Sequence, residues 1–158
     1  MLPLILTIQS CCFTCWEERP SDYKPISFSR DELNSKIKLS EPEPIVNSGK
    51  IYIKDNLLFI GEEKKGFHVF DNSNPESPQK IKFLNILGAT DLAIRNNILY
   101  INQVTDLVTL TYNHLESKVT LSKRIENTFP ELETPDHREV TNPAPEGNVI
   151  IDWKRFKN

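Results

Sequence analysis

Three cysteines lie close together near the start of the chain, in the stretch LTIQSCCFTC at residues 6–15. Cys12 and Cys15 have the C-x-x-C spacing that redox pairs and zinc sites use. A redox pair of this type needs a βαβ setting, and a structural zinc ion needs four ligands. The next residue that could complete a zinc site, His68, lies far along the chain. We therefore rank a redox or metal-binding role for these cysteines lowest.

The residues in front of Cys11 resemble a bacterial lipobox, the site at which a signal segment is cut and a lipid is attached. Residues 1–10, MLPLILTIQS, have no charged side chain, with Ile8 at the third place before the cysteine and the small Ser10 directly before it. The apolar run is much shorter than the roughly 20 residues of a membrane-spanning helix, but it matches the apolar region of a secretion signal. We expect residues 1–10 to be the signal segment, Cys11 to carry the lipid and 11–25 to include a flexible tether. The alternative is a buried N-terminal strand followed by cysteines without a role.

No other set of residues has the spacing of a catalytic or metal-binding motif. The sequence lacks the G-x-S-x-G, glycine-rich phosphate-loop, H-E-x-x-H and calcium-loop patterns. Its three histidines are dispersed, at His68, His114 and His137. A repeated Thr-Asp-Leu at 90–92 and 105–107 could supply two carboxylates, but Asp and Thr before a strand commonly bind turn amides. We therefore predict no catalytic residue, no cofactor and no metal ion, and a His68 that faces solvent or is hydrogen-bonded locally.

The charge balance excludes one class of partner. The chain has 19 Lys and Arg residues against 22 Asp and Glu residues, a formal net charge of −3, so we expect no positive surface for a nucleic-acid backbone. With 158 residues, of which 38% are hydrophobic, it can form one domain with a modest core. Its prolines are unevenly placed, and the last group of them marks residues 129–147 as a charged loop.

Two segments of ten residues align without a gap and predict a repeated β-hairpin. They are IYIKDNLLFI at 51–60 and LAIRNNILYI at 92–101. The dipeptides DN at 55–56 and NN at 96–97 occupy equivalent places, and Asn and Asp tolerate the positive φ angles of two-residue hairpin turns. A third and a fourth strand follow at similar offsets. Each unit of about 40 residues thus holds four antiparallel strands, which is the size of a β-propeller blade.

The flanking segments complete the predicted organisation. Ser29 and Glu32 form a capping box, which predicts a short helix over about residues 30–37. Third strands are predicted at 66–71 and 106–112, and fourth strands at 79–86 and 118–127. The parts in order are a signal segment at 1–10, the anchor and tether at 11–25, a strand, helix and Pro-rich lead-in at 26–48, two repeats at about 49–90 and 91–128, a Pro-rich loop at 129–147 and a C-terminal strand at 148–158.

The repeated region resembles the LVIVD-repeat proteins, propeller-type lipoproteins found mainly in Bacteroidetes. The resemblance is carried by GKIYIKDNLLFIGEEKKGFHVFDNSNPESPQKIKFLNILGATDLAIRNNILYI and the following DLVTLTY, and SFSRDELNSKIKL resembles the region before the first repeat. Val69, Phe70 and Asp71 keep the family pattern, whereas the second unit departs from it with Thr and Tyr. The resemblance covers roughly residues 26–128. It implies blade-like repeats and a lipid anchor, and it supplies no catalytic motif.

We therefore expect an all-β fold of about two antiparallel four-stranded, propeller-blade-like repeats with one short N-terminal helix. The expected function is that of a non-catalytic lipoprotein at the periplasmic or surface face of the outer membrane, where it contacts a protein or glycan of the cell envelope or scaffolds other chains. A closed propeller needs at least four blades, so three explanations stay open: the flanking segments cap the pair, copies of the chain assemble, or the gene product is truncated. The alternative function is a subunit or fragment of a larger propeller whose binding or enzymatic site forms only on assembly.

Overall fold

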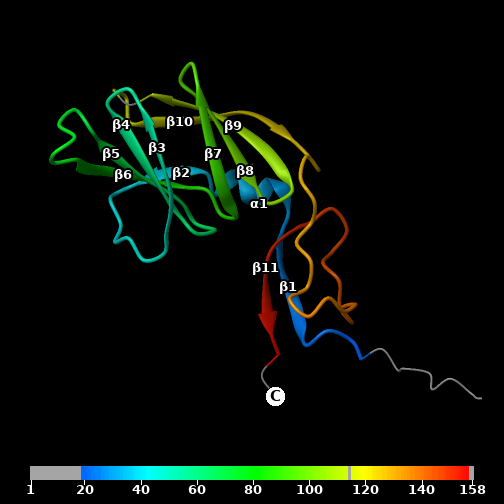
Figure 1. Cartoon of the computed structure of the whole chain (residues 1–158). Helices are drawn as coiled ribbons and strands as arrows, with labels where there is room; N and C mark the ends of the chain where they lie inside the picture. Colours follow the sequence, from blue (N-terminus) through cyan, green and yellow to red (C-terminus); the bar gives the residue numbers. More distant parts are fainter. Residues whose placement is uncertain (1–18, 114, 157–158) are drawn as a thin grey trace, which may run out of the picture.

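The computed structural model describes residues 19–113 and 115–156. Within them, β-strands and one short helix form two large antiparallel sheets and a two-stranded ribbon (Figure 1). The predicted all-β class and the single helix are confirmed. The predicted signal segment and the lipid-attachment residue Cys11 lie outside the described residues. No helix in the described ranges is long and apolar enough to cross a membrane.

The first sheet contains the first repeat as a meander of four antiparallel strands. These strands are β3 (Ser48–Lys54), β4 (Leu57–Glu62), β5 (Gly66–Asp71) and β6 (Gln79–Asn85). A fifth strand, β2 (Lys38–Ser40), pairs with β6, so the strand order is β2-β6-β5-β4-β3. The sequence pattern did not predict β2, because three residues are too few to show an alternation of apolar and polar side chains.

The second sheet contains the second repeat in the same arrangement. Its strands are β7 (Ala89–Arg95), β8 (Ile98–Gln103), β9 (Asp106–Asn113) and β10 (Lys118–Ile125), in the order β10-β9-β8-β7. Asn96 and Asn97 both have positive φ angles, 48° and 61°, as a type I′ hairpin turn requires. In the first repeat only Asp55 of the equivalent pair has a positive φ angle, 53°. The repeated hairpin is thus confirmed, with a different turn in the first unit.

The two sheets pack face to face, and the main core lies between them. Because side chains alternate along a strand, each sheet turns one face into this core and the other face outward. The rings of Phe59 and Tyr112 meet edge to face across the interface, with centroids 6.1 Å apart. The buried members of this core are Phe59, Phe67, Val69, Leu84, Ile86, Ala89, Leu92, Leu99, Ile101, Val108, Leu110 and Tyr112. Strands β3 and β7 lie next to each other at one side of the pair, and β2 contacts β10 at the other.

A ribbon of two strands extends from the sheets (Figure 1). Strand β1 (Tyr23–Phe28) pairs antiparallel with β11 (Val149–Arg155). Val149 and Ile151 pack with Leu33 and Val104 in a second, smaller core, which joins the ribbon to the helix and the second sheet. The predicted C-terminal strand therefore exists, and its partner is β1 rather than a strand of either repeat.

The helix α1 (Arg30–Ser35) begins where the capping box predicts. The Ser29 Oγ accepts from the Glu32 amide at 3.3 Å, and the Glu32 carboxylate accepts from the Ser29 amide at 2.8 Å. The helix ends two residues earlier than expected, with Lys36 as its C-cap. Leu33 is its buried residue and packs into the second core.

The folded part begins earlier than the predicted tether at 11–25 allows. Ser21 is buried, its amide donates to the Glu139 carbonyl oxygen at 2.7 Å, and its Oγ donates to Asp136 Oδ1 at 2.8 Å. Tyr23–Pro25 belong to β1. These contacts also fix the 129–147 loop, which holds no helix or strand. The sequence pattern missed them because both partners lie more than a hundred residues downstream.

Candidate functional site

A buried carboxylate at the start of β9, Asp106, is the centre of a polar cluster. Its side chain is 0% exposed. Arg30 donates to it from Nε at 2.9 Å and from Nη2 at 3.1 Å, and Arg124 donates from Nη1 at 2.8 Å. The Asn127 amide and the Thr105 hydroxyl each donate to Oδ1 at 3.0 Å. The cluster therefore ties the helix to β9 and β10.

These contacts keep Asp106 charged although it is buried. Burial alone would raise its pKa, but hydrogen bonds from two guanidinium groups and an amide outweigh the burial and hold the pKa at about 2. Arg124 continues the network to Gln103 Oε1 at 2.6 Å and to Asn34 Oδ1 at 2.8 Å. Because each charged group has a partner of opposite charge or a hydrogen-bonding partner, the cluster fits a structural role.

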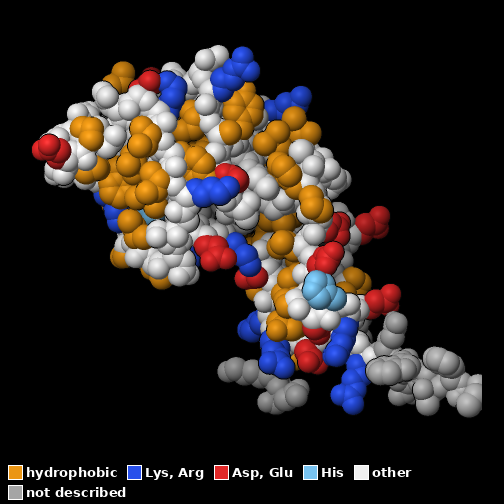
Figure 2. All heavy atoms as spheres, viewed as in Figure 1, with side chains coloured by type: hydrophobic (Ala, Val, Ile, Leu, Met, Phe, Trp, Pro, Cys, Tyr) orange, Lys and Arg blue, Asp and Glu red, His pale blue; other side chains and the backbone are white. Residues whose placement is uncertain are grey.

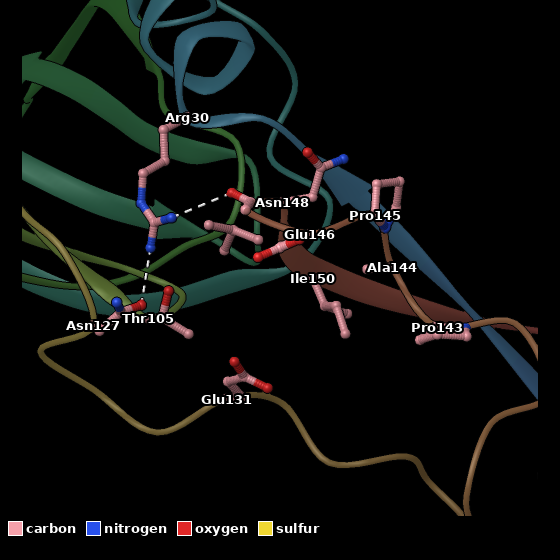
Figure 3. Close-up of a pocket in the computed structure, with 12 residues that line it drawn as sticks. Arg30, Thr105, Asn127, Glu131, Pro143, Ala144, Pro145, Glu146, Asn148 and Ile150 are labelled. Carbon is pink, nitrogen blue, oxygen red and sulfur yellow. Dashed lines mark hydrogen bonds between the residues drawn. The ribbon is translucent and has the colours of Figure 1, made fainter.

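A surface hollow of about 380 Å³ lies beside this cluster (Figure 3). Arg30 and Asn127 lie on one side of it and the loop of residues 143–148 on another. The Arg30 guanidinium already donates to a carbonyl oxygen of that loop at 3.3 Å and to Asn127 Oδ1 at 2.9 Å, besides Asp106. The other charged lining groups are the carboxylates of Glu131 and Glu146. The described lining therefore offers no free cation to an anionic ligand.

A second buried pair joins Glu62 and His68 in the first sheet. His68 Nε2 lies 3.0 Å from Glu62 Oε2, and the two side chains are 0% and 3% exposed. Glu62 also accepts the amides of Asn47 at 2.7 Å and Val46 at 3.0 Å, which holds the lead-in loop beside the sheet. Burial raises the pKa of Glu62, but the His68 and amide hydrogen bonds outweigh it and lower the pKa to about 2. His68 is thus hydrogen-bonded locally and does not face solvent.

Asp91, the other aspartate of the repeated Thr-Asp-Leu, has a separate set of partners. Tyr52 Oη donates to it at 2.5 Å and Lys50 Nζ at 2.6 Å, which links β3 to β7. Burial and the hydrogen bond to this carboxylate raise the pKa of Tyr52 to about 12. A hollow of about 500 Å³ lies nearby, lined in part by Lys50, Tyr52 and Thr90. Asp91 therefore joins the two sheets rather than pairing with Asp106.

The described residues contain no group of three His, Cys, Asp or Glu side chains that could hold a metal ion. His137 lies on the exposed 129–147 loop, 3.0 Å from Glu133, and His114 is outside the described residues. His68 is fully buried, so its ring nitrogens do not reach a substrate in solution. The dispersed histidines of the sequence are not brought together by the fold.

The outward face of the first sheet carries partly exposed apolar side chains next to the buried Glu62–His68 pair. We call its side chains the open face: Ile51, Ile53, Leu58, Ile60 and Phe70. Ile51 pairs with Ile60, and Ile53 pairs with Leu58, so they form two adjacent rows. Ile51 and Ile53 are 60% and 64% exposed. Figure 2 shows hydrophobic side chains gathered over the first sheet at the left of the view.

The equivalent positions of the second repeat are buried. By the alignment of the hairpins and the register of the strands, the open face corresponds to Leu92, Ile94, Leu99, Ile101 and Leu110. Four of these are at most 4% exposed, and Ile94 is packed against the same core. The same face of the repeat therefore packs on a neighbouring sheet in the second unit and is open in the first.

The outward face of the second sheet carries hydroxyl groups together with the partly exposed side chains of Ile98, Tyr100 and Leu107. Thr109 Oγ1 donates to the Lys123 carbonyl oxygen at 3.2 Å, and the hydroxyls of Thr111 and Ser122 lie 2.9 Å apart. Tyr112, next in the strand, points into the core. The hydroxyl groups of these threonines are hydrogen-bonded on a face that neither described sheet covers.

No family model matches the chain, and no curated protein or solved structure matches it. The candidate site is therefore identified from the contacts and exposure of the chain's own residues. Sequence reasoning did not identify the open face, although a signal was present. Ile51 and Ile53 are apolar on the outward side of β3, whereas Thr109 and Thr111 are polar on the outward side of β9.

We expect Asp106→Asn to lower the free energy of unfolding by about 3 kcal/mol, because it leaves two guanidinium groups without their carboxylate in a largely buried site. Asp152→Asn is the matched control. It breaks the Lys64–Asp152 pair, whose side chains are 38% and 45% exposed, and should cost less than about 1 kcal/mol. Denaturant unfolding measures both, and equal losses would contradict the structural role of Asp106.

We also expect the free energy of unfolding to fall as the pH becomes acidic. The pKa values of Asp106 and Glu62 are lower in the folded chain than their ordinary values. Their contribution is therefore present above the ordinary pKa of a carboxyl group, and it is lost as the pH falls toward about 2. Between a pH of about 2 and the ordinary pKa of a carboxyl group, the free energy of unfolding of Asp106→Asn should change less steeply with pH than that of the native chain. The same slope for both proteins would show that Asp106 does not contribute.

Proposed function

We propose that this chain is a non-catalytic interaction module of the cell envelope, built from two propeller-type blades of the LVIVD-repeat kind and exported as a lipoprotein. The observation that carries the proposal is the open face. The second repeat uses this face to bind a sheet, and the first repeat presents it to solvent. An apolar surface with a polar border is typical of a protein-interaction site.

The stacking of the sheets supports the blade interpretation. The core-facing side of the second repeat is equivalent to the outward side of the first. Each repeat therefore offers one type of face to the repeat before it and another to the repeat after it. Face-to-face association of this head-to-tail kind is how radially repeated blades pack.

The hydrogen bonds of three carboxylates support a non-catalytic role. Asp106, Glu62 and Asp91 accept hydrogen bonds from Arg, His, Lys or Tyr side chains of the described fold. A general base or nucleophile must reach a substrate, whereas His68 and Glu62 are 0% and 3% exposed. These groups hold loops and sheets together, which suits a scaffold that presents a surface.

The sequence in front of Cys11 supports a membrane anchor at that residue. An uncharged apolar run that ends in Ile-Gln-Ser before a cysteine is typical of an exported lipoprotein. The anchor places the module at the periplasmic or surface face of the outer membrane. Its partners there are proteins or glycans of the envelope, or further copies of the chain.

A second candidate is favoured by the same open face. A subunit or fragment of a larger propeller would use it to receive the preceding blade, and a binding or enzymatic site would form only in the assembly. In that case a specific partner chain covers the open face. The two candidates therefore differ in the identity of the partner and in whether activity appears on assembly.

Replacing Cys11 by Ser tests the anchor. We expect the native chain to fractionate with membranes and to yield a diacylated peptide beginning at Cys11, because lipid addition requires the thiol. The Cys11→Ser variant should lose the lipid and leave the membrane fraction or stay unprocessed. Cys12→Ser is the matched control and should behave like the native chain. A native chain recovered unprocessed and without lipid would contradict the location.

Crosslinking in intact cells tests the interaction surface. A photo-crosslinking phenylalanine derivative in place of Ile53 should give a defined crosslinked product, because this side chain is the most exposed member of the open face. The same derivative in place of Ala93 is the control. Ala93 is also exposed on an edge strand, but on the outward side of the second sheet. Products from neither position, or from Ala93 alone, would contradict the proposed surface.

A further inference from the structure

We infer that the hollow of about 500 Å³ beside β3 and the start of β7 binds an uncharged oligosaccharide. We call this hollow the seam hollow. The inference goes beyond the proposed function, because none of the side chains of the open face lines the seam hollow. Four features lead to it: the bulges at its wall, its bare backbone, its free polar side chains and its balance of charge.

A β-bulge from each sheet lies at the wall of the seam hollow. In β3 the regular pairing is interrupted at Gly49 and Lys50, and in β7 it is interrupted at Thr90. All three residues line the hollow, and the alignment of the two hairpins makes Gly49 equivalent to Thr90. Bulges change the direction of side chains and are frequent beside binding sites. Both sheets therefore depart from regular pairing at this one place.

Two glycines in the strands leave part of the wall bare. Gly49 and Gly61 lie opposite each other and line the hollow. A Cβ atom at either place would meet its nearest neighbour at an ordinary distance, 3.7 Å for Gly49 and 3.6 Å for Gly61. The fold itself therefore does not require glycine there, and glycine weakens a strand. Close approach of a ligand to the backbone explains both residues.

Three polar side chains at the hollow are free to bind a ligand. Asn47, Ser48 and Thr90 are exposed and line the hollow, and their side chains make no hydrogen bond within the described residues. The backbone of Asn47 is nevertheless fixed, because its amide donates to Glu62 Oε1 at 2.7 Å and its carbonyl oxygen accepts from the Glu63 amide at 3.1 Å. Free amide and hydroxyl groups on a fixed backbone are preorganised for hydrogen bonds to a ligand.

The charges of the lining favour an uncharged ligand. The charged groups are two lysines and two glutamates: Lys50, Lys64, Glu62 and Glu63. Lys50 Nζ donates to Asp91 at 2.6 Å, and Lys64 Nζ donates to Asp152 at 2.6 Å. Glu62 accepts the two loop amides and contacts His68. An anionic ligand would have to compete with existing ion pairs for either lysine, so charge gives it no advantage.

The remaining lining matches the chemistry of a sugar. Tyr52, Phe67 and Ala89 give the hollow an apolar part beside the free amide and hydroxyl groups. A sugar ring has apolar C–H faces and a rim of hydroxyl groups that both donate and accept hydrogen bonds, so it can contact both parts at once. The volume of about 500 Å³ lies within the range of small-ligand sites. The hollow therefore has room for a short oligosaccharide.

An NMR titration of the isotope-labelled full chain carrying Cys11→Ser, which cannot be acylated, tests the inference. The uncharged probes are maltotetraose, cellotetraose, mannotetraose and chitotetraose, and tetragalacturonate is the acidic probe. At least one uncharged probe should shift the amides of Gly49, Gly61 and Thr90 to saturation, and tetragalacturonate should not.

Two variants test the site itself. Asn47→Ala, Ser48→Ala and Thr90→Ala together should raise the dissociation constant at least about tenfold. The melting temperature should stay unchanged, because these side chains have no partner within the described fold. The matched control combines Thr120→Ala, Thr141→Ala and Asn142→Ala, which are exposed and lie outside the hollow, and should bind like the native chain. Gly61→Val should fill the bare wall and abolish binding without loss of stability.

Four results would overturn the inference: no shift with any uncharged probe, shifts confined to another part of the chain, native affinity in the triple alanine variant, or binding of tetragalacturonate as tight as that of the uncharged probes. Ile53→Glu should bind the sugar like the native chain, and loss of binding in this variant would place the sugar on the open face instead. Crosslinking at Ile53 tests the proposed function without any sugar, so the two can fail separately.

Discussion

The packing of one four-stranded sheet on another is the constraint on which this structure depends. Neither repeat can bury its apolar side chains alone, because a single sheet has no partner for either face. The main core lies between the two sheets, with Phe59 and Phe67 from one and Leu99 and Ile101 from the other. The Asp106 cluster then fixes the helix against the second sheet, and the Tyr52–Asp91 contact joins the edge strands β3 and β7 of the two sheets. Charged groups thus set the geometry of a contact whose stability comes mainly from apolar burial.

The two ends of this stack differ, and the difference indicates function. At one end, threonine hydroxyls hydrogen-bond on the outward face of the second sheet and make it compatible with water. At the other end, isoleucines occupy positions whose equivalents in the second repeat are buried. The apolar end is therefore the place where we propose that the protein meets its partner.

The sequence predicts those features that depend on residues close together in the chain. The hairpins follow from Asn and Asp at the turns, and the helix start follows from Ser29 and Glu32, since each depends on contacts within a few residues. The pairing of β1 with β11 and the Arg30–Asp106 contact join residues far apart in the chain, so no local pattern predicts them. The alternation along β3 shows two sets of side chains, but only the packed structure tells which set faces the core.

Hydrogen–deuterium exchange of the full chain, purified and in envelope membranes, tests the central claim most directly. If a partner covers the open face, amides of β3, β4 and the loop before them should become slower to exchange in the membranes, and those of β9 and β10 should not change. Protection that rises on the second sheet instead, or at neither end of the stack, would contradict this account.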